Sequence, residues 1–336
     1  MFHEARVLPQ APPSPVGVNG VPAIGTYQGF MQTVTWEGWQ GPLAQGWLRR
    51  KMHHKQWHYC SVLGERCVAA CAIIDAGYAA QAFVYVFDRE AGEILADKTL
   101  MGLPGMARVA STAGPGASSS FMSLGGTLRL SRAAGSPAWS LSARLGREIR
   151  LDAILRGDRE PVSLCAVAAV PGGGVNCTHK TVGLPVEGTI LVHGRSLSLD
   201  GSFAVLDHTS GLLPRRTEWR WASASGEGIG LNLVQGFNGE KENAVWLEGQ
   251  LIKVGEATIE YPKGERSPWR VRTSDGVVDL EFVPEGARRA DTNLLVAKSF
   301  YVQPVGTFRG TLRPEGRKVF TVERLVGVTE HHVAVW

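Results

Sequence analysis

The segment from Asp207 to Glu248, DHTSGLLPRRTEWRWASASGEGIGLNLVQGFNGEKENAVWLE, concentrates tryptophan, arginine and acidic side chains. Trp219 and Trp221 stand two residues apart, so on a β-strand both side chains point to the same face. Trp246 and Glu248 have the same spacing. If these two faces line one cavity, it has aromatic walls and a carboxylic acid set into it. The alternative interpretation is that the tryptophans belong to an ordinary core and the charges lie in turns.

Outside this segment the chain consists of short apolar or alternating runs separated by glycine and proline, a pattern typical of β-strands. A length of 336 residues with 41 glycines and 18 prolines indicates an all-β protein of two domains. Residues 1–20 are rich in proline and are expected to form an extended arm over the first domain. Residues 171–188 contain several turn signals, so we place the boundary there, with domains at 21–180 and 181–336.

An internal repeat indicates that the two domains share one fold. In both halves an Arg-Arg pair precedes a Trp-x-aromatic pair, then Gly-Glu, then a glycine followed by an aromatic residue. The copies are Arg49-Arg50, Trp57-x-Tyr59, Gly64-Glu65, Gly77-Tyr78 and Arg215-Arg216, Trp219-x-Trp221, Gly226-Glu227, Gly236-Phe237. The distance from the first tryptophan to Gly-Glu is the same in both copies. We therefore predict that the two halves have the same topology.

Charge and cysteine content exclude several functional classes. The net charge of +4 comes from basic residues scattered among acids, so no nucleic-acid partner is expected. Five cysteines, an odd number without tight spacing, indicate reduced thiols in a cytoplasmic protein. The N-terminal residues lack the apolar core of a signal peptide, and no run approaches the ~20 apolar residues of a membrane helix. We expect no stable membrane insertion.

Metal and nucleotide sites are also not expected. Cys67 and Cys71 have half of a zinc-site spacing, but no second pair follows. Histidines gather at His53–His58 and at Glu330–His332, where adjacent residues on a strand point to opposite faces and offer few convergent ligands. Gly226–Gly230 is followed by a strand-like alternation and not by a helix, which disfavours a phosphate loop. We therefore predict no metal and no cofactor.

The Trp-rich segment raises the hypothesis of acid catalysis in an aromatic pocket. A carboxyl group kept away from water has a raised pKa and can donate a proton at neutral pH. Tryptophan faces stabilise developing positive charge by cation–π attraction. Glu248 is the first candidate for this acid because it follows Trp246 on the same face, and Asp207 and Glu242 are alternatives. The competing interpretation is that Glu248 is a solvated acid in a hairpin turn.

The predicted site combines catalytic and ligand-binding candidates. The catalytic candidates are Glu248, Asp207, His208 and Glu242. The ligand-binding candidates are Trp57, Tyr59, Tyr78, Arg215, Arg216, Trp219, Trp221, Asn238, Asn243 and Trp246. Glycine and proline within residues 211–214 break the strand, so the chain is expected to reverse there. Asp207 and His208 would then meet the arginines at positions 215 and 216.

Several motifs together resemble the family catalogued as domain of unknown function 2804. They are Lys55-Gln-Trp-His-Tyr59, Asp75-Ala-Gly-Tyr78, Leu206-Asp-His-Thr-Ser-Gly211, Arg216-Thr-Glu-Trp-Arg-Trp-Ala222, Glu242-Asn-Ala-Val-Trp246, Pro268-Trp269, Val278-Asp-Leu280 and Gly327-x-x-Glu330-His331. The resemblance spans nearly the whole chain, and the motifs taken together are specific to that family. The family has no assigned chemistry, so the resemblance implies a relationship and no reaction.

More distantly, the Trp-rich second half is similar to the hydroxyneurosporene synthase (carotenoid 1,2-hydratase) superfamily, which includes lipocalin-like fungal pericyclases. This resemblance implies two lipocalin-like antiparallel barrels with a pocket for an apolar molecule near their junction. In the hydratases an inward acid protonates an alkene and aromatic rings stabilise the cation. Trp219-x-Trp221 and Trp246-x-Glu248 stand where that pattern has His-x-Trp and Tyr-x-Asp. These departures disfavour carotenoid hydration itself.

We therefore predict an all-β protein of two lipocalin-like antiparallel β-barrel domains related by pseudo-symmetry. It is expected to bind an apolar or isoprenoid-like small molecule and, if it is an enzyme, to catalyse a cofactor-free acid–base addition, elimination or cyclisation. Two alternatives stay open: a non-catalytic lipid carrier, and a carbohydrate-active protein that uses tryptophan platforms and paired carboxylates. A long apolar cavity would favour the first two functions, and an open polar groove the third.

Overall fold

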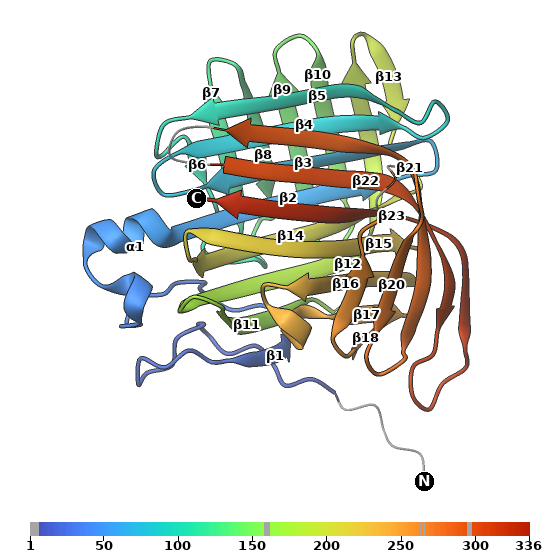
Figure 1. Cartoon of the computed structure of the whole chain (residues 1–336). Helices are drawn as coiled ribbons and strands as arrows, with labels where there is room; N and C mark the ends of the chain where they lie inside the picture. Colours follow the sequence, from blue (N-terminus) through green and yellow to red (C-terminus); the bar gives the residue numbers. More distant parts are fainter. Residues whose placement is uncertain (1–6, 158–161, 263, 265, 294–297) are drawn as a thin grey trace.

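The computed structural model describes residues 7–157, 162–262, 264, 266–293 and 298–336, and these are mostly antiparallel β-sheet (Figure 1). The described strands form two sheets, one of fourteen strands and one of nine. The helical segments η1 (Pro42–Ala44), α1 (Trp47–His53) and η2 (Gly239–Glu242) are short and lie in connections. In the part of the chain that is described, no helix is long and apolar enough to span a membrane.

The strands follow the order of the chain, with one sheet completed before the other begins. The first sheet contains β1 (Gly25–Gln28), β2 (His54–Leu63), β3 (Cys67–Asp75), β4 (Ala80–Asp88), β5 (Glu93–Gly102), β6 (Ala107–Arg108), β7 (Ser118–Ser123), β8 (Gly126–Ser131), β9 (Trp139–Leu145), β10 (Ile149–Leu155), β11 (Leu164–Val170), β12 (Gly174–Val192), β13 (Arg195–Ser198) and β14 (Ser202–Leu212). The second sheet contains β15 (Arg216–Gly226), β16 (Ile229–Gly236), β17 (Ala244–Leu247), β18 (Gln250–Lys253), β19 (Ala257–Glu260), β20 (Trp269–Thr273), β21 (Val278–Asn293), β22 (Lys298–Leu312) and β23 (Phe320–Val335).

The two sheets share the central part of their connectivity. Each contains a four-stranded meander, β2 to β5 and β15 to β18, and the last strand of each sheet returns to pair with the first strand of its meander. These closing pairs are β14 with β2 and β23 with β15. The ends of each sheet curl towards each other, so that β6 packs on β3 and β19 on β16. At the second seam the Gln235 side chain accepts a hydrogen bond from the Ile259 amide at 2.8 Å. Each sheet is therefore a barrel that strand pairing leaves open along one seam.

The internal repeat corresponds to the first hairpin of each barrel. The Trp-x-aromatic pair lies on β2 in one copy and on β15 in the other. In each copy Gly-Glu lies at the end of that strand, where the hairpin turns. The glycine–aromatic pair then lies at or just after the end of the second hairpin strand, β3 in the first copy and β16 in the second. The all-β class and the two-barrel architecture expected from the sequence are confirmed.

The chain passes from one barrel to the other at residues 213–215, whereas the sequence placed the boundary near residue 180. Lys180 lies within β12, a strand of 19 residues that belongs to the first sheet. The glycine and proline that suggested a linker instead mark an irregularity in this strand. Its pairing with β14 shifts register between Val182 and Leu184, and Gly183 has a φ of 83°. Such a bulge bends a long strand without ending it.

The N-terminal arm lies along the first barrel from residue 7 onward, and residues 1–6 fall outside the described residues. Gln10 forms an isolated bridge with Gln28 of β1. Further along, Met31 and Trp36 are buried against Cys177 and other side chains of β11 and β12. The arm thus continues past residue 20 to Trp36 and covers the face of β11 and β12 that carries Cys177, which is turned away from the second barrel.

Hydrophobic side chains fill both barrels and also the space between them. Trp139 belongs to the core inside the first barrel, and Trp269 to the core inside the second. A third cluster takes Tyr59 from the first sheet and Trp221 from the second. Because Tyr59 and Cys60 are neighbours on β2, they point to opposite faces, and Cys60 belongs to the inner core. The barrels therefore pack on each other through their outer faces.

Candidate active site between the barrels

A cavity of about 380 Å³ lies between the outer faces of the two barrels. The first barrel contributes side chains from β2, β3, β4, β12 and β14, and the second from β15, β21, β22 and β23. The aromatic lining residues are Trp57, Tyr59, Tyr78, Phe83, Trp219, Trp221, Phe237, Tyr301 and Trp336. This volume falls in the range of small-molecule sites, and the aromatic walls suit an apolar ligand.

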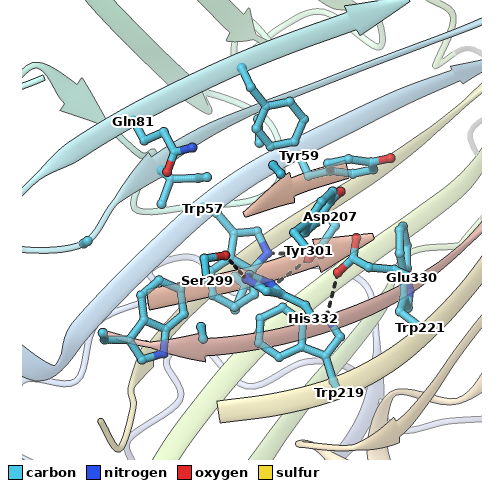
Figure 2. A pocket seen from close by; sticks show the side chains of 18 of the residues that line it. Trp57, Tyr59, Gln81, Asp207, Trp219, Trp221, Ser299, Tyr301, Glu330 and His332 are labelled. Carbon is cyan, nitrogen blue, oxygen red and sulfur yellow. Dashed lines mark hydrogen bonds between the residues drawn. The ribbon is translucent and has the colours of Figure 1, made fainter. Parts of the chain in front are cut away.

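Two carboxyl groups enter this cavity in matching ways (Figure 2). In the first barrel the indole N–H of Trp57 donates to Asp207 at 3.1 Å. In the second barrel the indole N–H of Trp219 donates to Glu330 at 2.7 Å. Each acid lies on the last strand of its barrel, directly opposite the second aromatic residue of the repeat on the first strand. The two acids therefore occupy equivalent positions.

Asp207 is part of a buried ion pair. Lys180 Nζ lies 2.8 Å from its carboxylate, and the hydroxyls of Thr178 and Thr209 donate to it at 3.1 and 2.8 Å. The same ammonium lies 3.7 Å from Glu242, whose own pKa is raised by burial. Burial alone would lower the pKa of Lys180, but the carboxylates of Asp207 and Glu242 outweigh it and raise the pKa. Lys180 is therefore charged.

Glu330 has neutral partners in the place where Asp207 has a lysine. Gln303 donates its amide N–H to the second Glu330 oxygen at 2.8 Å. The Gln303 carbonyl oxygen accepts the hydroxyl of Tyr85 at 2.5 Å, which holds the amide in this orientation. Among the described residues, no ammonium or guanidinium lies within ion-pair distance of Glu330; the pairs of Lys180 are with Asp207 and Glu242.

The pKa of Glu330 is raised to about 7, and burial is the main cause. The side chains of Trp219, Tyr301 and Gln303 lower the pKa by hydrogen bonding, while the charge of Asp207 raises it further. Burial prevails because Glu330 is only 7% exposed. At neutral pH a substantial fraction of Glu330 therefore carries a proton that it can donate.

His332 lies two residues after Glu330 on β23, so both side chains point to the same face of the strand. Its ring packs edge-on against Trp219, with centroids 4.5 Å apart, and its Nε2 is hydrogen-bonded to Ser299 Oγ at 2.9 Å. Burial lowers the pKa of His332 to about 3, and the charges of His331 and Arg288 lower it further. The imidazole is therefore neutral and offers hydrogen bonding without charge.

Arg288 supplies the remaining buried charge of the cavity wall. Its guanidinium lies 4.2 Å from the ring centroid of Phe83 and 5.3 Å from that of Tyr301. Its Nε donates to the Asp97 carboxylate at 3.0 Å. This ion pair satisfies the charge of Arg288 from outside the cavity.

A family model described as a domain of unknown function (DUF2804) matches residues 20–336. The chain belongs to this family. The resemblance that the sequence motifs indicated is therefore confirmed. No curated protein matches the chain.

Solved structures share the fold of this DUF2804 protein at low sequence identity. AttH from Nitrosomonas europaea is 14% identical, with a TM-score of 0.56 over 84% of this chain and 93% of its own. Kievitone hydratase from Nectria haematococca is 10% identical, with a TM-score of 0.55 over 99% and 98% of the two chains. CghA, solved with Sch210972, is 10% identical, with a TM-score of 0.52 over 98% and 97%. At these identities the likeness shows the fold alone.

The cavity contains eight of the residues that the sequence proposed for the site of this DUF2804 protein. They are Trp57, Tyr59, Tyr78, Asp207, Trp219, Trp221, Asn238 and Glu242. The other six, Glu248, His208, Arg215, Arg216, Asn243 and Trp246, lie outside its lining. The structure thus brings together residues from both copies of the repeat, although the sequence emphasised the second.

The expectation that Glu248 lies inside the pocket is wrong. Its carboxylate is exposed and lies 2.9 Å from Lys318 Nζ. Trp246 is buried between the barrels, and its indole N–H donates to the carbonyl oxygen of Val162 at 2.6 Å. β17 ends at Leu247, however, and Glu248 adopts a φ of 52° in the turn. Strand alternation therefore stops before Glu248, and its side chain does not share the face of Trp246.

The expected contact between Asp207 and the arginines is also wrong. β14 continues through Gly211 to Leu212, so the chain reverses at residues 213–215 and carries the arginines away from Asp207. Arg215 donates to the carbonyl oxygen of Trp336 at 3.1 Å, and Arg216 pairs with Glu218 at 2.8 Å.

Two further candidates have structural partners instead. His208 points to the opposite face of β14 from Asp207, and its Nε2 lies 2.7 Å from the carbonyl oxygen of Ala110. Asn243 accepts the Val234 amide at 2.7 Å and donates to the carbonyl oxygen of Gly255 at 3.0 Å. Buried polar groups of this kind hold the backbone together.

Sequence reasoning missed Lys180, Gln303, Tyr301, Glu330 and His332. Glu330 drew attention as a possible metal ligand and as part of a family motif, His332 only as a possible metal ligand, and Lys180 lay at the proposed domain boundary. The repeat itself holds a usable signal. Because the last strand of each half pairs with the first, an acid opposite the aromatic pair of one copy predicts an acid opposite the other.

Proposed function

We propose that this protein binds a largely apolar small molecule between its barrels and that Glu330 protonates it, in a cofactor-free addition, elimination or cyclisation. The observation that carries the proposal is a buried carboxyl group with a pKa raised to about 7, facing an aromatic cavity without an ion-pair partner among the described residues. Kievitone hydratase, by its name a hydratase, shares the fold and adds support to this class of reaction.

The chemistry follows from the two acids. The carboxyl proton of Glu330 passes to a carbon of an alkene or enol, and a positive charge develops on the neighbouring carbon. The faces of Trp219 and Trp221 stabilise that charge by cation–π attraction. Water adds to the cation and loses a proton to the Glu330 carboxylate, which completes a hydration and restores the acid; the reverse sequence eliminates water. Attack of a second double bond on the cation, followed by loss of a proton to the same carboxylate, completes a cyclisation. Asp207, which lies 2.8 Å from the ammonium of Lys180, orients the polar end of the ligand.

A non-catalytic carrier is the second candidate, and the cluster of Lys180, Asp207 and Glu242 favours it. Such a buried charged group can bind the polar end of a lipid while the aromatic walls hold the apolar part. The aromatic lining favours both of these functions over carbohydrate chemistry. Five unpaired cysteines are in keeping with a cytoplasmic location as part of this proposal.

The test begins with native mass spectrometry of the purified protein, which identifies a copurified small molecule. Glu330→Gln keeps the shape of the acid and removes its proton, and Glu248→Gln is the matched control at an exposed glutamate. We expect Glu330→Gln to bind the molecule and to lose at least ~100-fold in turnover. Equal turnover by Glu330→Gln and the wild type would refute the acid. Binding without turnover by any of the three proteins would establish the carrier.

A further inference from the structure

A second cluster of reactive side chains lies on the opposite face of β12 from the cavity. Lys180 points into the cavity, so its neighbour His179 points the other way. Across the sheet, His179 is paired with Cys165 of β11 on one side and with His208 of β14 on the other. β11 and β12 lie beside the N-terminal segment that contains β1 (Figure 1). The cluster is therefore enclosed between the sheet and the arm.

Three potential metal ligands converge in this enclosed space. Cys165 Sγ, Cys177 Sγ and one nitrogen of the His179 ring all lie within 4.8 Å of one another, and all three residues are buried. Met31 from the arm brings its sulfur to 3.7 Å from Cys177 Sγ. Ligands of a tetrahedral ion with bonds of ~2.3 Å are ~3.8 Å apart, so a small contraction would complete a site.

His179 also has an unused nitrogen. Its Nε2 accepts the amide N–H of Met31 at 3.2 Å, while its Nδ1 has no hydrogen-bond partner among the described residues. A buried imidazole nitrogen without a partner is uncommon and calls for an explanation. A neutral imidazole has one acceptor nitrogen, so binding a metal through either nitrogen would end the 3.2 Å hydrogen bond that His179 accepts from the Met31 amide. This loss is small compared with the gain of three metal–ligand bonds.

We propose that Cys165, Cys177 and His179 bind one soft metal cation, with the thioether of Met31 as a fourth ligand. Two thiolates, an imidazole and a thioether are ligands that Cu(I) prefers, and Zn(II) accepts the first three. Binding displaces the two thiol protons into solution. The ion joins the N-terminal arm to β11 and β12, directly behind the strand that positions Lys180.

The chain contains a matched control pair in Cys60 and Cys71. These cysteines face each other across β2 and β3 and are buried inside the first barrel. The only group of three potential ligands among the described residues is the one that contains Cys165 and Cys177. Both cysteine pairs are thus buried, but within the described part of the chain only the pair of Cys165 and Cys177 has a histidine, His179, close enough to complete a group of three ligands.

The experiment measures binding to the reduced full-length protein after removal of metals. Cu(I) is titrated anaerobically against a chromophoric chelator, and Zn(II) is titrated in the same way. We expect one ion per chain by native mass spectrometry, with X-ray absorption showing sulfur and nitrogen ligands. Cys165→Ser and Cys177→Ser should each weaken binding at least ~100-fold, whereas Cys60→Ser should bind as the wild type does. Met31→Leu should weaken Cu(I) binding and leave Zn(II) binding unchanged.

Other outcomes would overturn the proposal. Unchanged affinity in Cys165→Ser and Cys177→Ser, or a loss confined to Cys60→Ser, would place the ion elsewhere. The wild-type protein could instead be lighter by two hydrogens, show a Cys165–Cys177 disulfide in its peptide map and take up no metal after reduction. In that case the pair forms a disulfide and not a metal site. If the serine variants fail to fold, His179→Gln and Met31→Leu provide the same comparison. Absence of any rise in the wild-type melting temperature on adding Cu(I) or Zn(II) would also contradict the site.

Discussion

Trp57 and Trp219 stack on each other between the barrels, with ring centroids 6.1 Å apart and ring planes 16° apart. The two residues are equivalent in the internal repeat, and each donates its indole N–H to the acid of its own barrel. The repeat thus places two acids in one cavity. Lys180 is beside one acid and Gln303 is beside the other, so similar frameworks give one carboxyl group a charged partner and the other a neutral partner.

The stability of the protein should depend on pH through Glu330. Its pKa is about 7 in the folded protein and 4.5 as the ordinary value, so between these pH values the folded protein retains a proton that the unfolded chain releases. The free energy of unfolding therefore falls as pH rises through this window, by at most about 3 kcal/mol. Urea unfolding at pH 5 and pH 8 should therefore give a change in unfolding free energy that is more positive in Glu330→Gln than in the wild type.

Other groups in the cavity titrate as well, so the comparison between proteins is what matters. Lys180 and the tyrosines that face Glu330 are present in both proteins. His332 acts in the opposite direction, because its lowered pKa makes the folded protein release its proton first. Glu248→Gln should keep the wild-type dependence, and an identical dependence in Glu330→Gln would contradict the assignment.

Removal of Lys180 should be strongly destabilising. Lys180→Met leaves the buried carboxylates of Asp207 and Glu242 without their cation, which costs about 3–5 kcal/mol of unfolding free energy. The double variant Lys180→Met, Asp207→Asn should recover a large part of that loss, because it removes a buried charge. A double-mutant cycle by urea denaturation measures the coupling. Simple additivity of the two single effects would show that the pair is not coupled.

A lysine in place of Gln303 should make the second acid resemble the first. Gln303→Lys places an ammonium beside Glu330, which lowers the pKa of the carboxyl and leaves it ionised at neutral pH. If Glu330 is the proton donor, turnover at pH 7 should fall at least ~10-fold and its dependence on Glu330 ionisation should move to lower pH. The pH–rate profile checks this, with Gln303→Met as the uncharged control. An unchanged profile in Gln303→Lys would mean that another group donates the proton.

The two tryptophans should differ in their effect on acidity. Trp219→Phe keeps an aromatic ring but removes the hydrogen bond to Glu330 that lowers its pKa, so the pKa should rise above 7. Trp57→Phe removes the equivalent bond to Asp207 and should leave the titration of Glu330 nearly unchanged. Carbon-detected NMR of labelled glutamate side chains reports both. A larger shift in Trp57→Phe than in Trp219→Phe would reverse the assignment of the acids.

The sequence alone was sufficient for the all-β class, the repeat and a cavity with aromatic walls. These follow from local patterns: alternation at a spacing of two, turns at glycine and proline, and the order of motifs in the two halves. Trp57, Trp219, Trp221 and Asp207, which these patterns proposed as site residues, line the cavity.

Only the tertiary structure decided that Glu330, and not Glu248, lies in the aromatic cavity. Trp219 and Glu330 are 111 residues apart in the chain and meet because the last strand of the barrel pairs with the first. Glu248 is two residues after Trp246, yet the strand ends between them and the alternation is lost. A local pattern specifies the face of a side chain only while the strand continues, whereas the partner across the sheet depends on register. Register is set by the closure of the whole barrel.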